Sequence, residues 1–78
     1  MEPIRYNVFL EWDAEEEVWV TYVPSLNWLS TYGATQEEAL EQTREAITGY
    51  LEAAAEQHLD LPRANANAKL ATVEVAGP

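Results

Sequence analysis

Apolar and polar positions alternate along the first part of the chain. From Ile4 to Trp12 every second residue is apolar, which is the period of a strand with one buried face. The acidic segment Asp13 to Glu17 follows, and it leads into Val18 to Val23, which is rich in β-branched and aromatic residues. This pattern predicts a β-hairpin with an acidic tip. We expect the second strand to end at Pro24, because proline cannot donate a hydrogen bond to a ladder.

A short strand and a long helix are predicted next. The segment Trp28 to Tyr32 favours a third strand, which Gly33 should end. Thr35 and Glu38 have the spacing of a capping box, so a helix is expected to begin there. Apolar residues then recur every three or four positions, and most glutamates fall on the other side, as in a helix that packs one stripe on a sheet. The helix should end near His58, because a proline follows and the residue before a proline avoids helical angles.

The last part of the chain is predicted to return to the sheet. Residues 64–68 are typical of a connector, and Leu70 to Val75 alternate like a fourth strand. The predicted fold class is α+β in the order β-β-β-α-β, an antiparallel meander with one long helix packed on one face. Residues 1–61 would form the core of a single domain, and residues 62–78 its connector and fourth strand. The face without a helix and the sheet edges would need cover from a partner or a second copy.

The size of the chain supports one small domain. Its 78 residues are nearly half apolar, but a core of this size supplies little stability, so a dimer or tetramer is expected. The chain has no cysteine, which excludes disulfides and thiolate metal ligands. It has no apolar run of about 20 residues and no signal-peptide pattern, so we expect a cytoplasmic protein without membrane contact.

The charge of the chain is strongly unbalanced. Fourteen Asp and Glu oppose four Lys and Arg, which gives a formal charge of −10. Such a surface repels phosphate backbones, so we expect no direct binding of nucleic acid by this chain alone. It would attract a basic partner and speed the encounter. Excess acid would equally serve to keep a small domain soluble, and the charge alone does not decide between these interpretations.

Catalytic chemistry finds little support in the sequence. His58 is the single histidine and lies at a helix end, where a surface or capping role is expected. It is predicted to lie far from Ser30 and Thr35, so no nucleophile has a base beside it. Glu11 is the one acid well inside the first strand, and Asp13 belongs to a solvated tip, which makes a metal-dependent nuclease a remote alternative. We therefore predict no catalytic, cofactor-binding or metal-binding residue and no enzymatic activity.

Large apolar side chains are the candidates for contact with a partner or a second copy. The four candidate residues are Phe9, Trp19, Leu26 and Trp28. Phe9 is out of phase with the apolar side of its strand, and Trp19 is out of phase with the valines at positions 18 and 20, so it would face away from the helix if those valines face it. Leu26 and Trp28 lie in or beside the loop after the second strand, and exposed Trp side chains often anchor interfaces. Trp12, on the apolar side of the first strand, is expected in the core.

Several segments, in this order and spacing, resemble one family. They are Tyr6 to Leu10, the acidic tip, Val18-Trp19-Val20, Pro24-Ser25-Leu26, Tyr32-Gly33-Ala34-Thr35-Gln36-Glu37-Glu38-Ala39-Leu40 and Ala46-Ile47-Thr48-Gly49-Tyr50-Leu51. Together they resemble a HicB-like antitoxin domain over about Tyr6 to Leu61. Each segment is common by itself, and their order and spacing carry the resemblance.

The resemblance implies a truncated ribonuclease-H-like sheet and helix. It also implies a partner, the small basic toxin HicA, which cleaves messenger RNA and is neutralised when the antitoxin binds over it. This chain has Asn27-Trp28-Leu29 where the family usually has Pro-Gly-Cys. Many members add a C-terminal DNA-binding segment, whereas this chain ends after one predicted strand, so operator binding is not expected. The alternative is a homo-oligomeric interaction module of the same family that has no toxin.

Overall fold

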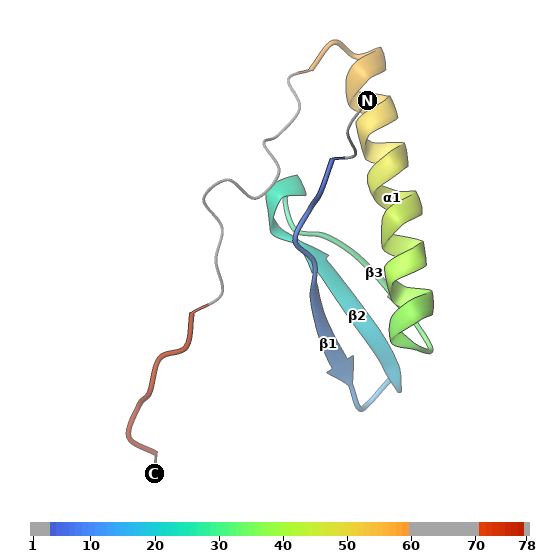
Figure 1. The fold of residues 1–78 in the computed structure, drawn as a ribbon. Helices are drawn as coiled ribbons and strands as arrows, with labels where there is room; N and C mark the ends of the chain where they lie inside the picture. The colour runs from blue at the N-terminus through green and yellow to red at the C-terminus, as the bar shows by residue number, and fades with distance from the viewer. Residues whose placement is uncertain (1–3, 60–70, 78) are drawn as a thin grey trace.

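The computed structural model describes residues 4–59 and 71–77. It contains a sheet, a short 3-10 helix and one long helix, in the order β1 (Phe9–Asp13), β2 (Val18–Val23), η1 (Pro24–Leu26), β3 (Leu29–Gly33) and α1 (Gln36–Glu56). The three strands are antiparallel, with β2 in the middle. Figure 1 shows α1 lying along one side of the sheet, beside β3, while β1 is the strand farthest from it. The predicted α+β meander with one long helix on one face is confirmed.

Strand β1 is shorter than the alternation predicts. It begins at Phe9, and residues 4–8 form no strand. The register explains the late start, because Phe9 pairs with Tyr22, two residues before Pro24. Pro24 begins the 3-10 helix η1 and has no N–H to donate, so β2 offers no ladder beyond this point. An alternating sequence makes a strand only where a neighbouring strand can pair with it.

The acidic hairpin tip is held by the first acid of its own segment. Asp13 is the last residue of β1, and its Oδ1 accepts hydrogen bonds from the backbone N–H of Glu15 (3.0 Å) and of Glu16 (3.2 Å). Residues 14–17 form the turn, and Glu17 closes it with a left-handed φ of 57°. The hairpin is therefore as predicted, with Asp13 serving as the side-chain acceptor that such turns commonly use.

Gly33 joins the sheet to the helix at close range. It is the last residue of β3, paired with Trp19, so β3 runs one residue later than predicted at each end. A Cβ at Gly33 would lie 2.5 Å from the backbone nitrogen of Ala39, so any other residue would force the backbone to shift. The helix begins as predicted, because Thr35 is its N-cap and the Thr35 hydroxyl accepts from the backbone N–H of Glu38 at 3.0 Å.

The helix ends at the position predicted, through a specific turn. His58 adopts a left-handed φ of 58°, and its N–H donates to the carbonyl of Ala55 at 3.2 Å. The N–H of Leu59 donates to the carbonyl of Ala54 at 2.9 Å. This pair of bonds is the Schellman motif, in which the last helical carbonyls are satisfied by the two residues beyond the helix. His58 thus has the helix-ending role that the sequence suggested.

One face of the sheet packs against α1 and forms the core. Directly paired residues share a face, so Trp19, Thr21 and Val23 of β2 lie on the side where Gly33 meets the helix. Val23 and Ala39 are completely buried there, and Leu26 of η1 closes one end with 1% of its surface exposed. Trp19 is in phase with Thr21 and Val23, as the sequence indicated. The sequence predicts that Trp19 faces away from the helix on the condition that the valines at positions 18 and 20 face it. In the structure these valines face away from the helix, and Trp19 lies on the helix side.

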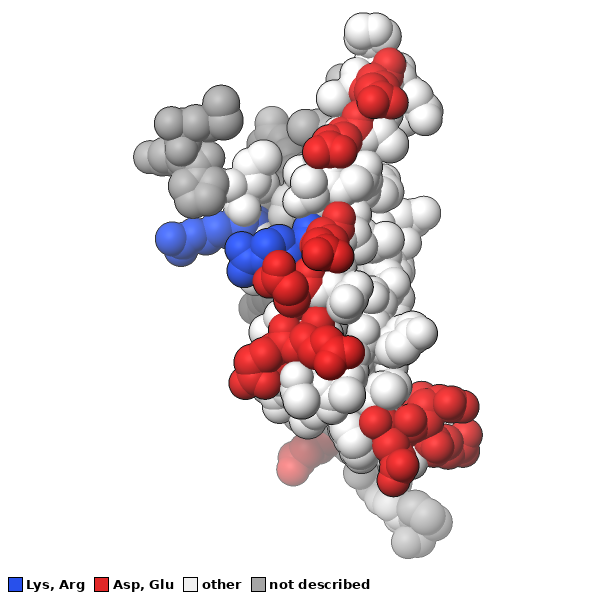
Figure 2. All heavy atoms as spheres, turned by 90° about the vertical axis from the view of Figure 1, so that its right-hand side faces the viewer, with Lys and Arg blue, Asp and Glu red and all other residues white. Residues whose placement is uncertain are grey.

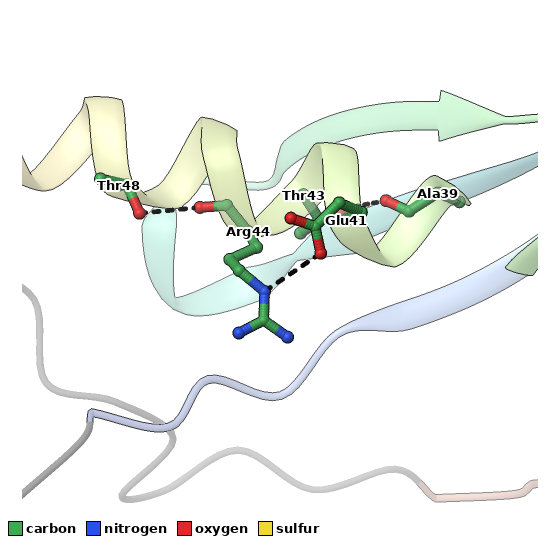
Figure 3. A network of polar contacts seen from close by, with 5 residues as sticks. All are labelled: Ala39, Glu41, Thr43, Arg44 and Thr48. Atoms are coloured by element: carbon green, nitrogen blue, oxygen red, sulfur yellow. Dashed lines mark hydrogen bonds and ion pairs between the residues drawn. The ribbon is translucent and has the colours of Figure 1, made fainter. Parts of the chain in front are cut away.

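A chain of hydroxyl groups joins the sheet to the helix inside this core. Thr21 and Thr43 are both buried, and their hydroxyl oxygens are 2.6 Å apart. The Thr43 hydroxyl donates to the carbonyl of Ala39 at 2.8 Å, one turn earlier in the helix (Figure 3). Each hydroxyl has one proton, and the bond from Thr43 to Ala39 is shorter than the 3.3 Å bond that Thr21 could donate to the carbonyl of Thr31. The lengths therefore favour Thr21 as the donor in the bond between the two threonines. The Thr21 hydroxyl in turn accepts from the backbone N–H of Thr31 on β3 at 3.2 Å.

The C-terminal segment is not part of the sheet. Residues 71–77 have no strand, and Val73 and Val75 are 81% and 83% exposed. The predicted fourth strand is therefore not formed in residues 71–75, while Leu70 and the predicted connector lie outside the described residues. The alternating pattern suits a strand, but the outer edges of β1 and β3 are not paired with this segment. In the described part of the chain, no helix combines the length and the apolar character needed to cross a membrane.

Candidate protein-binding surface

The face of the sheet opposite α1, which we call the open face, is largely apolar. The pairing places on it the apolar residues Phe9 of β1, Val18, Val20 and Tyr22 of β2, and Tyr32 of β3. The polar residues Glu11 and Asp13 of β1 and Ser30 of β3 lie on the same face. Of the five apolar residues, the first four are half-buried, whereas Tyr32 is 66% exposed although it belongs to a strand. No described helix covers this face, so a soluble partner or a second copy could bury it.

A hollow of about 330 Å³ opens on this face near the hairpin tip. Val18 and Val20 of β2 form its floor, and Ser30 and Tyr32 of β3 form one wall. Asp13 and Glu16 line the other side, since Asp13 pairs with Val18 across the hairpin and Glu16 belongs to the turn. The hollow therefore has an apolar floor, an aromatic wall and an acidic rim.

Two of the predicted contact residues lie together at the opposite end of the open face. The rings of Phe9 and Trp28 are 6.1 Å apart between centroids, with 54° between their planes. Trp28 is 58% exposed, and its backbone has a left-handed φ of 61°, directly after Asn27 with a φ of 58°. Asn tolerates this conformation, but it is uncommon for a bulky residue, and such strain concentrates at functional sites. The loop after η1 thus holds an exposed aromatic ring in a strained position.

The other two predicted contact residues lie on the helix side. Trp19 is half-buried and packs against Trp12, with ring centroids 5.5 Å apart. Leu26 is in the core, so it could touch a partner only if η1 moved. Trp12 was expected in the core, but it is 47% exposed, because α1 lies over β3 and β2 and leaves β1 largely uncovered. Contact with a partner stays a prediction for all four residues.

The sequence did not single out Tyr32, which forms a wall of the hollow. The sequence holds only a weak indication of its role. Tyr32 and Ser30 are two residues apart on a predicted strand, so they share a face of the sheet. The side of that face depends on the approach of the helix at Gly33, which the sequence alone does not reveal. An exposed tyrosine on an edge strand became a candidate only when the open face was known.

Acidic side chains dominate the charged groups on the helix side of the molecule. Figure 2 shows them distributed along the outer side of the helix and gathered in a cluster at the lower end, with few basic groups among them. The exposed helical acids are Glu37, Glu38, Glu41, Glu45, Glu52 and Glu56. Arg44 forms an exposed ion pair with Glu41 at 3.4 Å, which contributes little to stability (Figure 3). Among residues 4–59 and 71–77, no three carboxylate or imidazole groups lie close enough together to hold a metal ion.

A comparison with protein families adds to this picture. The model of the family described as HicB-like antitoxin of bacterial toxin-antitoxin system matches residues 6–75, which is nearly the whole chain. The chain belongs to the HicB-like antitoxin family. A UPF0150 protein of Thermoplasma acidophilum is 36% identical to this HicB-like chain over 63 residues, a match that covers 81% of this chain and 90% of the relative. No solved structure is significantly similar to it. The family resemblance predicted from the sequence is confirmed, and it supports an antitoxin role.

Proposed function

We propose that this HicB-like domain neutralises a small basic toxin of the HicA type, which cleaves messenger RNA, by binding over it. The open face is the observation that carries the proposal. It presents Phe9, Tyr32 and Trp28 as exposed or half-buried aromatic groups on a rigid sheet. Aromatic residues are enriched among the side chains that contribute most to protein interfaces, and a rigid sheet loses little entropy on binding.

The charge of the domain selects the kind of partner. At −10, like charge disfavours contact between two copies of this chain, whereas a basic ribonuclease is attracted. The acids also lie close to the open face, since Asp13 and Glu16 form the rim of its hollow. A basic toxin could therefore place apolar groups on the sheet and positive groups on this rim. This favours a toxin complex over the alternative of a homo-oligomeric module without a toxin.

The test is a titration of toxin activity. We expect a small basic protein of the HicA type to be encoded beside this chain. This protein would be purified, and cleavage of a messenger RNA would be followed while the antitoxin domain is added. We expect cleavage to cease near one equivalent, and association to slow as salt is raised, because charged encounters are screened. Cleavage that continues in the presence of excess domain would refute the proposal.

A control is needed because any polyanion competes with RNA for a basic protein. Polyglutamate added at the same total charge should inhibit the toxin only weakly, and without a sharp endpoint at one equivalent. Light scattering after size exclusion would then separate the two candidate functions. A complex with the toxin supports neutralisation by binding, whereas a stable dimer or tetramer that ignores the toxin supports the homo-oligomeric module.

A further inference from the structure

The hollow on the open face is small and combines an apolar floor with a polar rim. Its volume of about 330 Å³ lies at the lower end of the range of about 300–1,000 Å³ that small-molecule sites occupy. It is therefore small for a cofactor or nucleotide. Its floor of Val18 and Val20 matches the methylene stem of a long side chain, which can be buried while the charged end stays at the rim.

The aromatic wall supplies the second contact. Tyr32 lies directly opposite Val20 in the pairing of β2 with β3, and 66% of its surface is exposed. The ring is therefore largely open to contact by a ligand above the sheet. A guanidinium group can stack on such a ring, and it does so more readily than an ammonium group because it is planar and more weakly hydrated.

The acidic rim supplies the third contact. The Oδ1 of Asp13 is engaged by the backbone of the turn, which fixes the orientation of the carboxylate. A carboxylate accepts about four hydrogen bonds through two oxygens, so the group has capacity left for a donor above the hollow. Glu16 is exposed and lines the same hollow. Two carboxylates on one side of an aromatic wall match the planar fork of donors of an arginine.

We propose that this hollow receives an arginine side chain of the basic partner, with its stem over the two valines, its guanidinium against Tyr32 and its donors toward Asp13 and Glu16. The identity of the partner as a toxin rests on the proposed function, whereas the preference for arginine rests on the hollow alone. The charge of −10 brings a basic chain to this surface, and the hollow selects which of its side chains is held.

A matched pair of peptides tests this preference. One is a short end-blocked glycine peptide with a single arginine, and the other carries citrulline, which has nearly the same shape but no charge. Binding would be followed by the amide chemical shifts of the labelled full chain. We expect saturable shifts centred on Val18, Val20 and Tyr32 with the arginine peptide, and shifts at least several-fold weaker with citrulline. Equal binding of the two peptides would overturn the proposal.

Matched protein variants locate the site. Replacing Tyr32 by Ala should weaken arginine binding about two- to five-fold, as expected for an exposed cation–π contact, whereas Tyr32→Phe should keep it. Glu16→Gln should weaken binding, while Glu15→Gln should not, since both glutamates are exposed in one turn but only Glu16 lines the hollow. Equal effects of the two glutamine variants would show a general charge effect and overturn the site. All variants would first be compared with the parent by circular dichroism.

Two further outcomes separate this inference from the proposed function. Concentration-dependent shifts at Tyr32 without any peptide would show that a second copy occupies the hollow, and this would overturn the assignment to a basic partner. A Tyr32→Ala and Glu16→Gln double variant should dissociate from the toxin at least ten-fold faster than the parent. If this double variant neutralises the toxin as well as the parent does, the hollow is not where the toxin binds, and the proposed antitoxin function is unaffected. If the parent binds the arginine peptide but never inhibits the toxin, the arginine site in the hollow is supported and the proposed antitoxin function is refuted.

Discussion

The buried threonine pair is the place where a single hydroxyl should matter most. Replacing Thr43 by Val keeps the shape of the side chain but removes the group that accepts the Thr21 proton at 2.6 Å. The Thr21 hydroxyl, which is completely buried, is left with the carbonyl of Thr31 at 3.3 Å, a longer and weaker bond. Leaving a buried polar group poorly satisfied costs about 1–3 kcal/mol. Because Thr21 keeps the weaker bond to Thr31, we expect Thr43→Val to lower the free energy of unfolding by about 1–2 kcal/mol, in the lower half of that range.

The reverse change should be similar or larger. In Thr21→Val the backbone N–H of Thr31 loses the acceptor at 3.2 Å, and the Thr43 hydroxyl loses its donor but keeps its own bond to Ala39. The double variant removes both hydroxyls, so neither hydroxyl is left poorly satisfied, but the backbone N–H of Thr31 still lacks its acceptor. Its loss of stability should therefore be close to that of Thr21→Val alone. The losses should therefore not add, and the coupling energy should be about 1 kcal/mol or more.

The assay is urea unfolding followed by tryptophan fluorescence, with the four proteins of the cycle measured side by side. A matched control is available in the same helix, because the Thr48 hydroxyl donates to the carbonyl of Arg44 at 3.0 Å but is exposed (Figure 3). Thr48→Val should change stability little, since water replaces the lost bond. The reasoning fails if the two single losses add in the double variant, or if Thr48→Val costs as much as Thr43→Val.

Further predictions concern the two internal glycines and the helix ends, each measured by urea unfolding and by thermal melting. Gly49→Ala should stabilise the domain by about 1 kcal/mol, because an added Cβ would meet nothing within 4 Å; no rise in melting temperature would contradict this. Gly33→Ala should destabilise the domain by about 1–3 kcal/mol, because the added Cβ would lie 2.5 Å from the backbone nitrogen of Ala39. An unchanged urea midpoint would contradict this and show that the helix can shift freely. Thr35→Ala should cost about 1 kcal/mol through loss of the N-cap, with Thr35→Ser as the control that keeps it. His58→Gly should stabilise the helix end, because glycine adopts the left-handed conformation without strain, whereas His58→Val should destabilise it.

Local chemistry made most of the fold predictable. The capping spacing of Thr35 and Glu38 located the start of the helix, and the structure has the Thr35 bond that this spacing predicts. The acidic tip between two β-rich segments located the hairpin, and Pro24 located the end of β2. These features depend on residues close together in the sequence, so no knowledge of the tertiary structure was needed to find them.

The parts that could not be predicted depend on neighbours distant in the sequence. The alternation at residues 4–8 and 71–75 is that of a strand, but neither segment belongs to the three-stranded sheet formed by the described residues. The side of Trp19 could not be known before the helix was placed, and Gly33 decides that placement by allowing the backbone of Ala39 to approach. The open face and its hollow follow from the same contact, which is why Tyr32 was not recognised as part of a candidate site.

The small size of the domain and its capacity to bind have a common cause. A single helix that packs over β3 and β2 covers one face of a three-stranded sheet and leaves the other to solvent. The apolar groups on that open face would be a liability in a protein that had to remain alone, but in this chain they are combined with a charge of −10. Under the proposed function this charge favours a basic partner over a second copy, so the acids around the exposed sheet would also select the protein that covers it.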